Sequence, residues 1–141
     1  RGYHVHFKGQ DHLLSRPVIF LNRGFAITPM EQGLRVVGTV EFGGLDNPPS
    51  KKRILNLVNN ARYLFPELTE HYDEWLGFRP TLPDYLPVIG PSKKCQNLFY
   101  SFGHHHLGWT LGAITGKIVA GMIAEENSNL NLEPYSSQRF G

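Results

Sequence analysis

The first 42 residues alternate between apolar and polar positions in the way that β-strands do. In the first seven or eight positions the apolar residues Tyr3, Val5 and Phe7 alternate with the polar residues His4, His6 and Lys8. A period of two buries one face of a strand and leaves the other free. The same criterion predicts strands at residues 18–21, 25–30 and 34–42, of which the last is the longest.

Short connectors link the last three of these predicted strands. Asn22-Arg23-Gly24 and Glu31-Gln32-Gly33 each end in glycine, as tight hairpin turns require. Because the strands follow one another without intervening helices, the sheet is predicted to be antiparallel rather than Rossmann-like.

An amphipathic helix is predicted after this meander. Gly43-Gly44 and Asn47-Pro48-Pro49 break the sheet, and Ser50 stands where a helix N-cap belongs. Apolar residues follow at helical spacing and the run stops at Pro66: Ile54, Leu57, Val58, Ala61, Leu64 and Phe65. Such a helix is expected to lie on the sheet.

The rest of the chain predicts two more strands, at 72–79 and 98–102, separated by a proline-rich loop, and a long helix at about 107–126. The fold class is therefore α+β: an antiparallel or mixed sheet, an amphipathic helix packed on it, and a long C-terminal helix.

The long C-terminal helix has an apolar stretch almost sufficient to cross a bilayer, but Lys117 and several glycines argue against a membrane span. Small residues recur every four positions, at Gly108, Gly112, Gly116 and Ala120. In a membrane this stripe would favour a helix dimer. In a water-soluble protein it favours close packing against a sheet or a cofactor-binding domain, which is the preferred interpretation.

Composition narrows the function only a little. A length of 141 residues suits one domain, and a net charge of +2 without a basic, aromatic-interleaved stripe gives no reason to expect nucleic-acid binding. Cys95 is the only cysteine, so an internal disulfide and a thiolate metal site are excluded. We expect Cys95 to be an inert surface thiol, and the start of the chain has no apolar signal-peptide segment.

Two groups of residues are candidates for chemistry. Arg79 precedes Pro80, which favours an extended backbone and fixes the root of a side chain able to grip a carboxylate through two hydrogen bonds. Spacing alone also allows an ordinary ion pair of Arg79 with Asp73, Glu74 or Asp84.

The second candidate is the run His104-His105-His106. Three consecutive residues do not converge on one metal ion, so no metal is expected. The alternatives are a loop that leads into a helix N-terminus, where free N–H groups favour a developing negative charge, and an ordinary exposed helix start.

Three segments of the chain resemble the C-terminal signature of FAD-dependent amino-acid oxidoreductases. They are Gly77-Phe-Arg-Pro-Thr-Leu-Pro-Asp-Tyr-Leu-Pro-Val-Ile-Gly90, followed by Asn97-Leu-Phe-Tyr, and Gly103-His-His-His-Leu-Gly-Trp-Thr. Within that superfamily the chain is most similar to bacterial D-amino-acid dehydrogenases, relatives of glycine oxidase and sarcosine oxidase. The resemblance extends to the start, Arg1-Gly-Tyr-His, and to the tail from Pro134 to Phe140.

The resemblance implies roles for particular residues. Arg79 corresponds to the arginine that clamps the substrate carboxylate. The loop and helix start beneath the flavin pyrimidine correspond to a cofactor-binding set: Gly103, His104, His106, Leu107, Gly108, Trp109 and Thr110. Backbone N–H groups there would stabilise charge on the reduced flavin. No residue is expected to act as acid or base, because the hydride chemistry belongs to FAD.

The resemblance also implies an organisation in parts. Residues 1–76 would supply part of a substrate-binding sheet with its helix, and residues 77–141 a closing segment that contacts the flavin. No Gly-x-Gly-x-x-Gly follows a strand, so the dinucleotide-binding N-terminal half of the enzyme is expected to be absent. The fragment alone would then be inactive, and the missing half would be its main partner.

The activity implied for the complete enzyme is oxidative deamination of a D-amino acid by hydride transfer from Cα to flavin N5, with electrons passing to oxygen or a quinone. The resemblance suggests a cytoplasmic protein, peripheral at the inner membrane face in its dehydrogenase relatives. Leu82 and Tyr85-Leu86 depart from commoner residues near the substrate. Glycine or sarcosine, a cyclic imino acid such as proline, and a non-catalytic binding module are therefore the alternatives.

Overall fold

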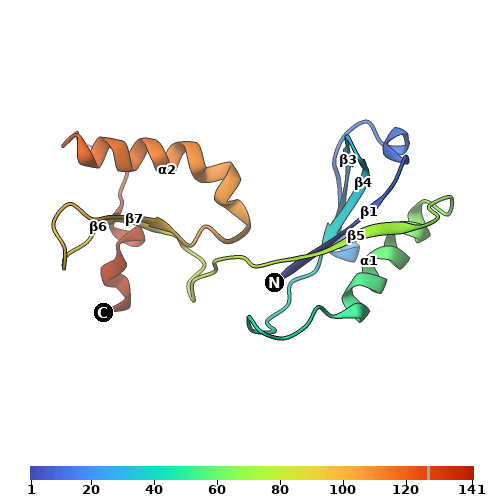
Figure 1. The fold of residues 1–141 in the computed structure, drawn as a ribbon. Coiled ribbons are helices and arrows are strands. Elements are labelled where there is room, and N and C mark those ends of the chain that lie inside the picture. The colour runs from blue at the N-terminus through green and yellow to red at the C-terminus, as the bar shows by residue number, and fades with distance from the viewer. Residues whose placement is uncertain (127) are drawn as a thin grey trace. The chain divides into compact units, whose positions relative to one another are not determined.

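The computed structural model describes residues 1–126 and 128–141. The chain divides into two compact units, Arg1–Phe78 and Arg79–Gly141. Both contain helix and antiparallel strands (Figure 1), so the predicted α+β class is confirmed. The assignment of residues 1–76 to a substrate sheet and 77–141 to a flavin-contacting segment stays a prediction.

The first unit is built on a five-stranded sheet. Its strands are β1 (Gly2–Phe7), β2 (Val18–Phe20), β3 (Phe25–Met30), β4 (Gly33–Gly38) and β5 (His71–Gly77). They lie in the order β2-β3-β4-β1-β5, and each neighbouring pair is antiparallel. The predicted meander is therefore present, with the first strand inserted between the fourth and the fifth.

Helix α1 (Lys51–Leu64) covers one face of this sheet. Four of its apolar residues are buried: Ile54, Leu57, Val58 and Ala61. They join a core that includes Tyr3, Val5 and Phe7 from β1, the residues that the alternation predicted to face inward. Burial of each large apolar side chain contributes about 1.5–3 kcal/mol, so this interface is the main source of stability in the unit.

The predicted strand at 34–42 is too long. Strand β4 ends at Gly38, and Thr39 has a φ of 61°, in the left-handed region that ends a strand. Beyond that break the Glu41 N–H donates to the Arg1 carbonyl at 2.9 Å, and the Glu41 carboxylate accepts from the hydroxyl of Tyr3 at 2.5 Å. The segment 39–42 therefore follows β1 without forming a regular ladder.

Helix α1 begins where Ser50 predicted it, although for a different reason. Ser50 occupies the N-cap position with an extended backbone, but its side chain caps no N–H group. Its own N–H donates to the hydroxyl of Tyr3 at 3.0 Å. The helix start is therefore fixed by a contact with β1.

Strand β5 carries a β-bulge opposite β1 and stops at Gly77, two residues before the predicted end at Arg79. His4 pairs with Trp75 and His6 with Tyr72, so one extra residue lies between these pairs. Asp73, within the bulge, has a φ of 52°. Bulges redirect side chains, and here Oδ2 of Asp73 comes to 2.9 Å from Nδ1 of His6.

The second unit contains a strand that the sequence analysis missed. β6 (Val88–Pro91) lies inside the proline-rich segment and pairs antiparallel with β7 (Phe99–Phe102). A 3₁₀ turn (His105–Leu107) follows and leads into helix α2 (Gly108–Ile123), and two further 3₁₀ turns form the tail (Glu133–Tyr135 and Ser137–Phe140). The helix thus ends three residues earlier than predicted.

Helix α2 exposes its small-residue stripe. A Cβ placed on Gly112 or Gly116 would meet no atom of the described chain within 4 Å, and Trp109 is 100% exposed. The predicted close packing of this stripe is therefore not provided by the described residues. Among those residues, no helix has the length and apolar character needed to span a membrane.

Candidate functional site

Backbone pairing joins the two segments predicted to carry chemistry. Thr81 forms an antiparallel bridge with His104, and the His105 N–H donates to the Pro80 carbonyl at 3.2 Å. The pairing stops there, because the chain turns into the 3₁₀ turn His105–Leu107 directly after His104. The arginine segment and the histidine loop therefore run side by side within the second unit.

Gly103 starts the histidine loop in a conformation that requires glycine. Its φ is +84°, and a Cβ built on it would lie 2.5 Å from Cδ1 of Leu82. A side chain here would be strained at this backbone angle and would have to displace the end of the Leu82 side chain. Gly103 therefore fixes the path along which the chain enters the loop, against the proline-rich segment.

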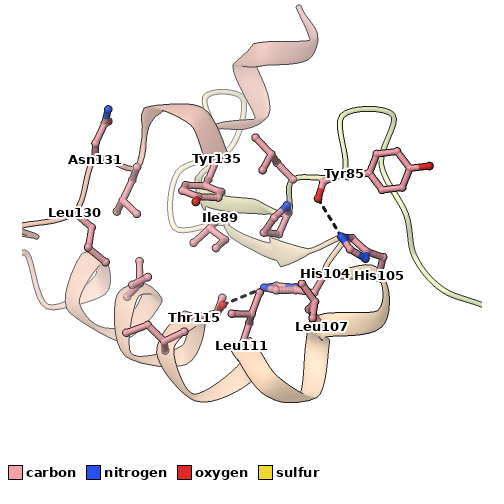
Figure 2. Close-up of a pocket in the computed structure, with 15 residues that line it drawn as sticks. Tyr85, Ile89, His104, His105, Leu107, Leu111, Thr115, Leu130, Asn131 and Tyr135 are labelled. Carbon is pink, nitrogen blue, oxygen red and sulfur yellow. Dashed lines mark hydrogen bonds between the residues drawn. The ribbon is translucent and has the colours of Figure 1, made fainter. Parts of the chain in front are cut away.

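The three histidines make three different contacts. Nε2 of His104 lies 3.0 Å from Oγ1 of Thr115, a buried residue of α2. Nε2 of His105 lies 3.1 Å from the carbonyl oxygen of Tyr85, and its Nδ1 lies 2.7 Å from Nδ1 of His106. Figure 2 shows the first two contacts as dashed lines. The loop is thus tied to α2 on one side and to the segment around Tyr85 on the other.

An apolar cavity of about 360 Å³ lies between the histidine loop, helix α2 and the tail. Figure 2 shows His104, Leu107 and Leu111 on one side of it and Tyr135 and Leu130 on the others. Of the residues predicted to bind cofactor, only His104 and Leu107 line this cavity. The remaining ones do not: Gly103, His106, Gly108, Trp109 and Thr110.

The exposed members of that predicted set form the start of α2. His106, Gly108, Trp109 and Thr110 are all exposed, and no side chain caps the first turn of the helix. Uncapped N–H groups at a helix N-terminus attract negative charge. The structure therefore separates the predicted set into a side that faces the cavity and a side that faces outward.

Arg79 is half-buried at the beginning of the second unit. The three carboxylates considered as its ion-pair partners each have another partner. Asp84 is bound by Arg139, Oδ2 of Asp73 lies 2.9 Å from Nδ1 of His6, and Glu74 lies 2.8 Å from His71. These contacts of the three carboxylates do not test what Arg79 binds, and its carboxylate-binding role stays a prediction.

A second polar cluster was not predicted from sequence. His4, His6 and Asp73 offer ligand atoms that all lie within 4.8 Å of one another. The period-two alternation had put both histidines on the face of β1 away from the core. It gave no sign of Asp73, which is 67 residues after His6 and enters only through the bulge of β5.

This cluster has the wrong tautomer for a metal site. Nε of Arg35 donates to Nε2 of His6 at 2.9 Å, and a guanidinium can only donate. Neutral His6 therefore carries its proton on Nδ1, the atom that faces Asp73 and would have to bind the ion. Burial, followed by the charge of Arg35, lowers the pKa of His4; this favours the neutral imidazole that metals bind, so only the tautomer of His6 disfavours a metal.

Residues 1–122 match the model of a protein family described as "FAD dependent oxidoreductase". The chain is 32% identical over 145 residues to a D-amino-acid oxidase of Bradyrhizobium diazoefficiens, covering 99% of this chain and 34% of that protein. It is 43% identical over 94 residues to D-amino acid dehydrogenase 3 of Mesorhizobium japonicum, covering 66% and 23%. The chain thus spans about a third or less of the length of these curated relatives.

The fold also matches a solved structure. Glycine oxidase from Geobacillus kaustophilus superposes with a TM-score of 0.81 at 27% sequence identity, covering 96% of this chain and 37% of that one. The similarity therefore includes both compact units.

Proposed function

This chain belongs to the family of FAD-dependent oxidoreductases, and we propose that it forms the C-terminal part of an enzyme that oxidatively deaminates a D-amino acid. The observation that carries the proposal is the pairing of Thr81 with His104. That pairing sets a proline-framed arginine beside a loop that opens an uncapped helix. The arginine can bind a carboxylate, and the N–H groups of the uncapped helix start can stabilise the electron-rich edge of a cofactor.

Arg79 is proposed to bind the substrate carboxylate. The residue is followed by Pro80, whose ring restricts the backbone and whose carbonyl accepts a hydrogen bond from the His105 N–H. Both constraints fix the backbone next to Arg79. A planar guanidinium on a fixed backbone can present two parallel N–H donors to a carboxylate, which lysine cannot do. Half-burial strengthens such a contact, because less water competes for the donors.

The residues of α2 fit a flavin. Gly112 and Gly116 leave open space where side chains would stand, and the first turn offers N–H groups that no side chain occupies. We propose that the outward side of the predicted set, comprising His106, Gly108, Trp109 and Thr110, lies against the cofactor. FAD, when bound, supplies the hydride acceptor. The chain itself orients the substrate and offers N–H dipoles where negative charge develops.

The segment around Tyr85 bears on which small amino acid is the substrate. Tyr85 is 57% exposed with a φ of 61° and makes an edge contact with the His105 ring, 5.8 Å between ring centroids. The resemblance puts the segment of Tyr85 and Leu86 near the substrate, so these side chains would bear on substrate size. Glycine or sarcosine, or a cyclic imino acid, is therefore the second candidate class, which the similarity to a glycine oxidase favours. A non-catalytic binding module is the third.

The proposed enzyme could be a dehydrogenase or an oxidase, and each alternative implies its own electron acceptor and cellular location. Dehydrogenation would pass electrons to a quinone at the inner membrane face, and oxidation would pass them to oxygen in the cytoplasm. Comparing reoxidation of the reduced flavin by oxygen and by a soluble quinone separates the two.

The test is anaerobic reduction of the flavin in the complete enzyme that carries this chain. We expect bleaching of the flavin absorbance by one or more members of a panel of D-amino acids. Arg79→Lys should lower kcat/KM about 10- to 100-fold, which corresponds to losing a charged hydrogen bond worth about 1.5–3 kcal/mol.

Arg16→Lys, at an exposed position of the first unit, is the matched control and should leave the kinetics unchanged. Reduction by glycine, sarcosine or proline alone would move the assignment to the second class. Near-normal kinetics of Arg79→Lys would remove Arg79 from the site.

A further inference from the structure

We propose that strand β7 gains a second neighbour in the complete enzyme, a strand of the FAD-binding remainder that pairs with its free edge. This inference rests on the proposed function, in which this chain is the C-terminal part of a longer enzyme. It deepens that function by naming a surface on which the two parts join. The evidence is the direction of the backbone groups of β6 and β7 and what covers each side of this strand pair.

One hydrogen bond fixes the direction of the backbone groups in the pair. The Ser92 N–H donates to the Leu98 carbonyl at 2.8 Å, and these two residues continue the register in which Gly90 faces Tyr100. In an antiparallel ladder, directly opposite residues alternate between pairs that exchange two hydrogen bonds and pairs that exchange none. Counting from this bond, Gly90 and Tyr100 exchange hydrogen bonds, and the pairs on either side of them do not.

The pairs that exchange no hydrogen bonds point their backbone groups outward. They are Ile89 with Ser101 and Pro91 with Phe99. On the β7 side, the N–H and C=O groups of Phe99 and Ser101 therefore form an edge directed away from β6. Residues 1–126 and 128–141 pair β7 with β6 alone and give these four groups no hydrogen-bond partner. Such an edge is a template for a further strand.

The opposite edge, on β6, is closed. Pro91 has no N–H group, so a strand added there would lack one donor of the ladder, and proline is typical of strands at the edge of a sheet. Ile89, the other residue that points its backbone outward here, is only 5% exposed. Both 3₁₀ turns of the tail contact β6 as well. Of the two edges, the β7 edge is therefore the one that can take a new strand.

Both faces of the strand pair are covered. Helix α2 contacts β6 and β7, and Figure 1 shows this helix on one side of the pair and the tail on the other. A sheet covered on both faces can be extended only at an edge. The closed β6 edge leaves the β7 edge as the direction in which the sheet continues.

Helix α2 is too long and too apolar for the surface that it covers. Its 16 residues span about 24 Å, whereas β6 and β7 have four residues each and are about 13 Å long. Lys117 is its only charged residue, yet Thr115 is the only one of its residues, all of them described, that is buried. A helix that is apolar on all sides is normally buried. A wider sheet would give α2 the partner that it lacks.

The remainder of the complete enzyme is the partner that these observations favour. The chain covers 34% of the D-amino-acid oxidase of Bradyrhizobium diazoefficiens and 37% of the glycine oxidase. In an enzyme of that length, about two-thirds of the residues would lie outside this chain and could supply a strand. A second copy could offer its own β7 edge, but four residues on each side make a small contact for a stable dimer.

The pairing has a functional consequence, because β7 leads directly into the histidine loop. Gly103 follows Phe102, the last residue of β7, and the loop then enters α2. A strand of the FAD-binding remainder that is hydrogen-bonded to β7 would fix this loop relative to the part that holds the rest of the cofactor. The proposed cofactor contacts at the start of α2 would then be positioned by backbone pairing.

Hydrogen exchange at single-residue resolution tests the pairing in the complete enzyme that carries this chain. The amides of Tyr100 and Phe102 point toward β6 and should be protected with or without a new strand. We expect the amides of Phe99 and Ser101 to exchange at least about 100-fold more slowly than unstructured amides, because paired amides exchange only when the strand opens. Fast exchange of Phe99 and Ser101 beside slow exchange of Tyr100 and Phe102 is the pattern of an edge strand and would overturn the proposal.

Ser101→Pro provides a second test. On a free edge, a proline whose missing N–H faces solvent is tolerated, as Pro91 is on β6. Between two strands it removes a ladder hydrogen bond, so we expect the melting temperature of the complete enzyme to fall by about 5 °C or more. Ser101→Thr keeps the N–H group and is the matched control, with an expected change of less than about 1 °C.

Failure of Ser101→Pro alone to yield folded enzyme supports the pairing, and wild-type melting of this variant contradicts it. Protection of Phe99 and Ser101 that is lost when the enzyme is diluted to a monomer would indicate a second copy and overturn the proposal. Protection in an enzyme whose flavin no amino acid reduces would keep the pairing and refute the proposed function. Flavin reduction together with edge-like exchange would refute the pairing alone.

Discussion

Arg139 binds Asp84 across 55 residues of sequence. Its Nε lies 2.5 Å from Oδ2 and one terminal nitrogen lies 3.3 Å from Oδ1, while the same nitrogen donates to the carbonyl of Leu86 at 2.7 Å. The guanidinium therefore fastens the tail to the segment that carries Tyr85. Arg139 and the N–H of Leu86 also hold the pKa of the Asp84 carboxyl below its usual range.

Asp84→Asn should loosen the tail without unfolding the second unit. The amide removes the charge but leaves the contact of Arg139 with Leu86, so we expect faster hydrogen exchange across residues 133–140 and little change elsewhere. Because the folded pKa of Asp84 is lowered, the contact is fully stabilising above the unfolded pKa and weakens as pH falls below it. The wild-type tail should therefore exchange like that of Asp84→Asn in acid. Glu133→Gln is the matched control, and equal exchange in both variants at neutral pH would contradict the clamp.

Leu57→Ala should destabilise the first unit strongly. Leu57 is fully buried against the sheet, so the truncation removes apolar contact and leaves a cavity, at a cost of about 2–5 kcal/mol. Leu55 lies on the same helix but is 54% exposed, and Leu55→Ala should change the free energy of unfolding by less than about 0.5 kcal/mol. Urea denaturation followed by circular dichroism gives both values. Similar losses for the two variants would mean that α1 packs on the sheet by another face.

Gly112→Ala should have opposite effects in two contexts. In this chain the added methyl group meets no atom of the described residues within 4 Å, and alanine favours a helix over glycine by about 1 kcal/mol. We expect the melting temperature of the isolated chain to rise slightly. In the complete enzyme, where the stripe is proposed to lie against the cofactor or its domain, the same methyl group should weaken flavin retention during dialysis. Unchanged retention would show that this face of α2 packs against nothing closely.

The sequence predicted those strands and helices whose burial pattern is set by residues close together in the chain. The alternation of Tyr3, Val5 and Phe7 and the spacing from Ile54 to Ala61 report directly which side chains are buried, so β1 and α1 were found. Strand β3 was predicted with its observed bounds. Errors occurred where one backbone angle overrides a pattern: Thr39, with its positive φ, ends β4 although apolar residues continue beyond it.

Features that depend on distant residues were not available from the sequence. Strand β6 is short and lies among prolines, and only its pairing with β7 makes it a strand. The cluster of His4, His6 and Asp73 exists because a bulge in β5 changes the register. The contact of His105 with the Tyr85 carbonyl was not available either, because the two residues are 20 positions apart in the sequence.

The position of β1 in the sheet has a consequence for how the first unit folds. Among the five strands of this sheet β1 comes first along the chain, yet its two partners are β4 and β5, so one of its hydrogen-bonding edges stays open until β4 has been made and the other until residue 77 has been made. The hairpin of β3 and β4 closes a short loop and can form early, whereas β1 must wait for a much longer one. Most of the delay in folding should therefore lie in capturing β1, and a nascent chain arrested before β5 would present an unpaired strand edge to chaperones or to other chains.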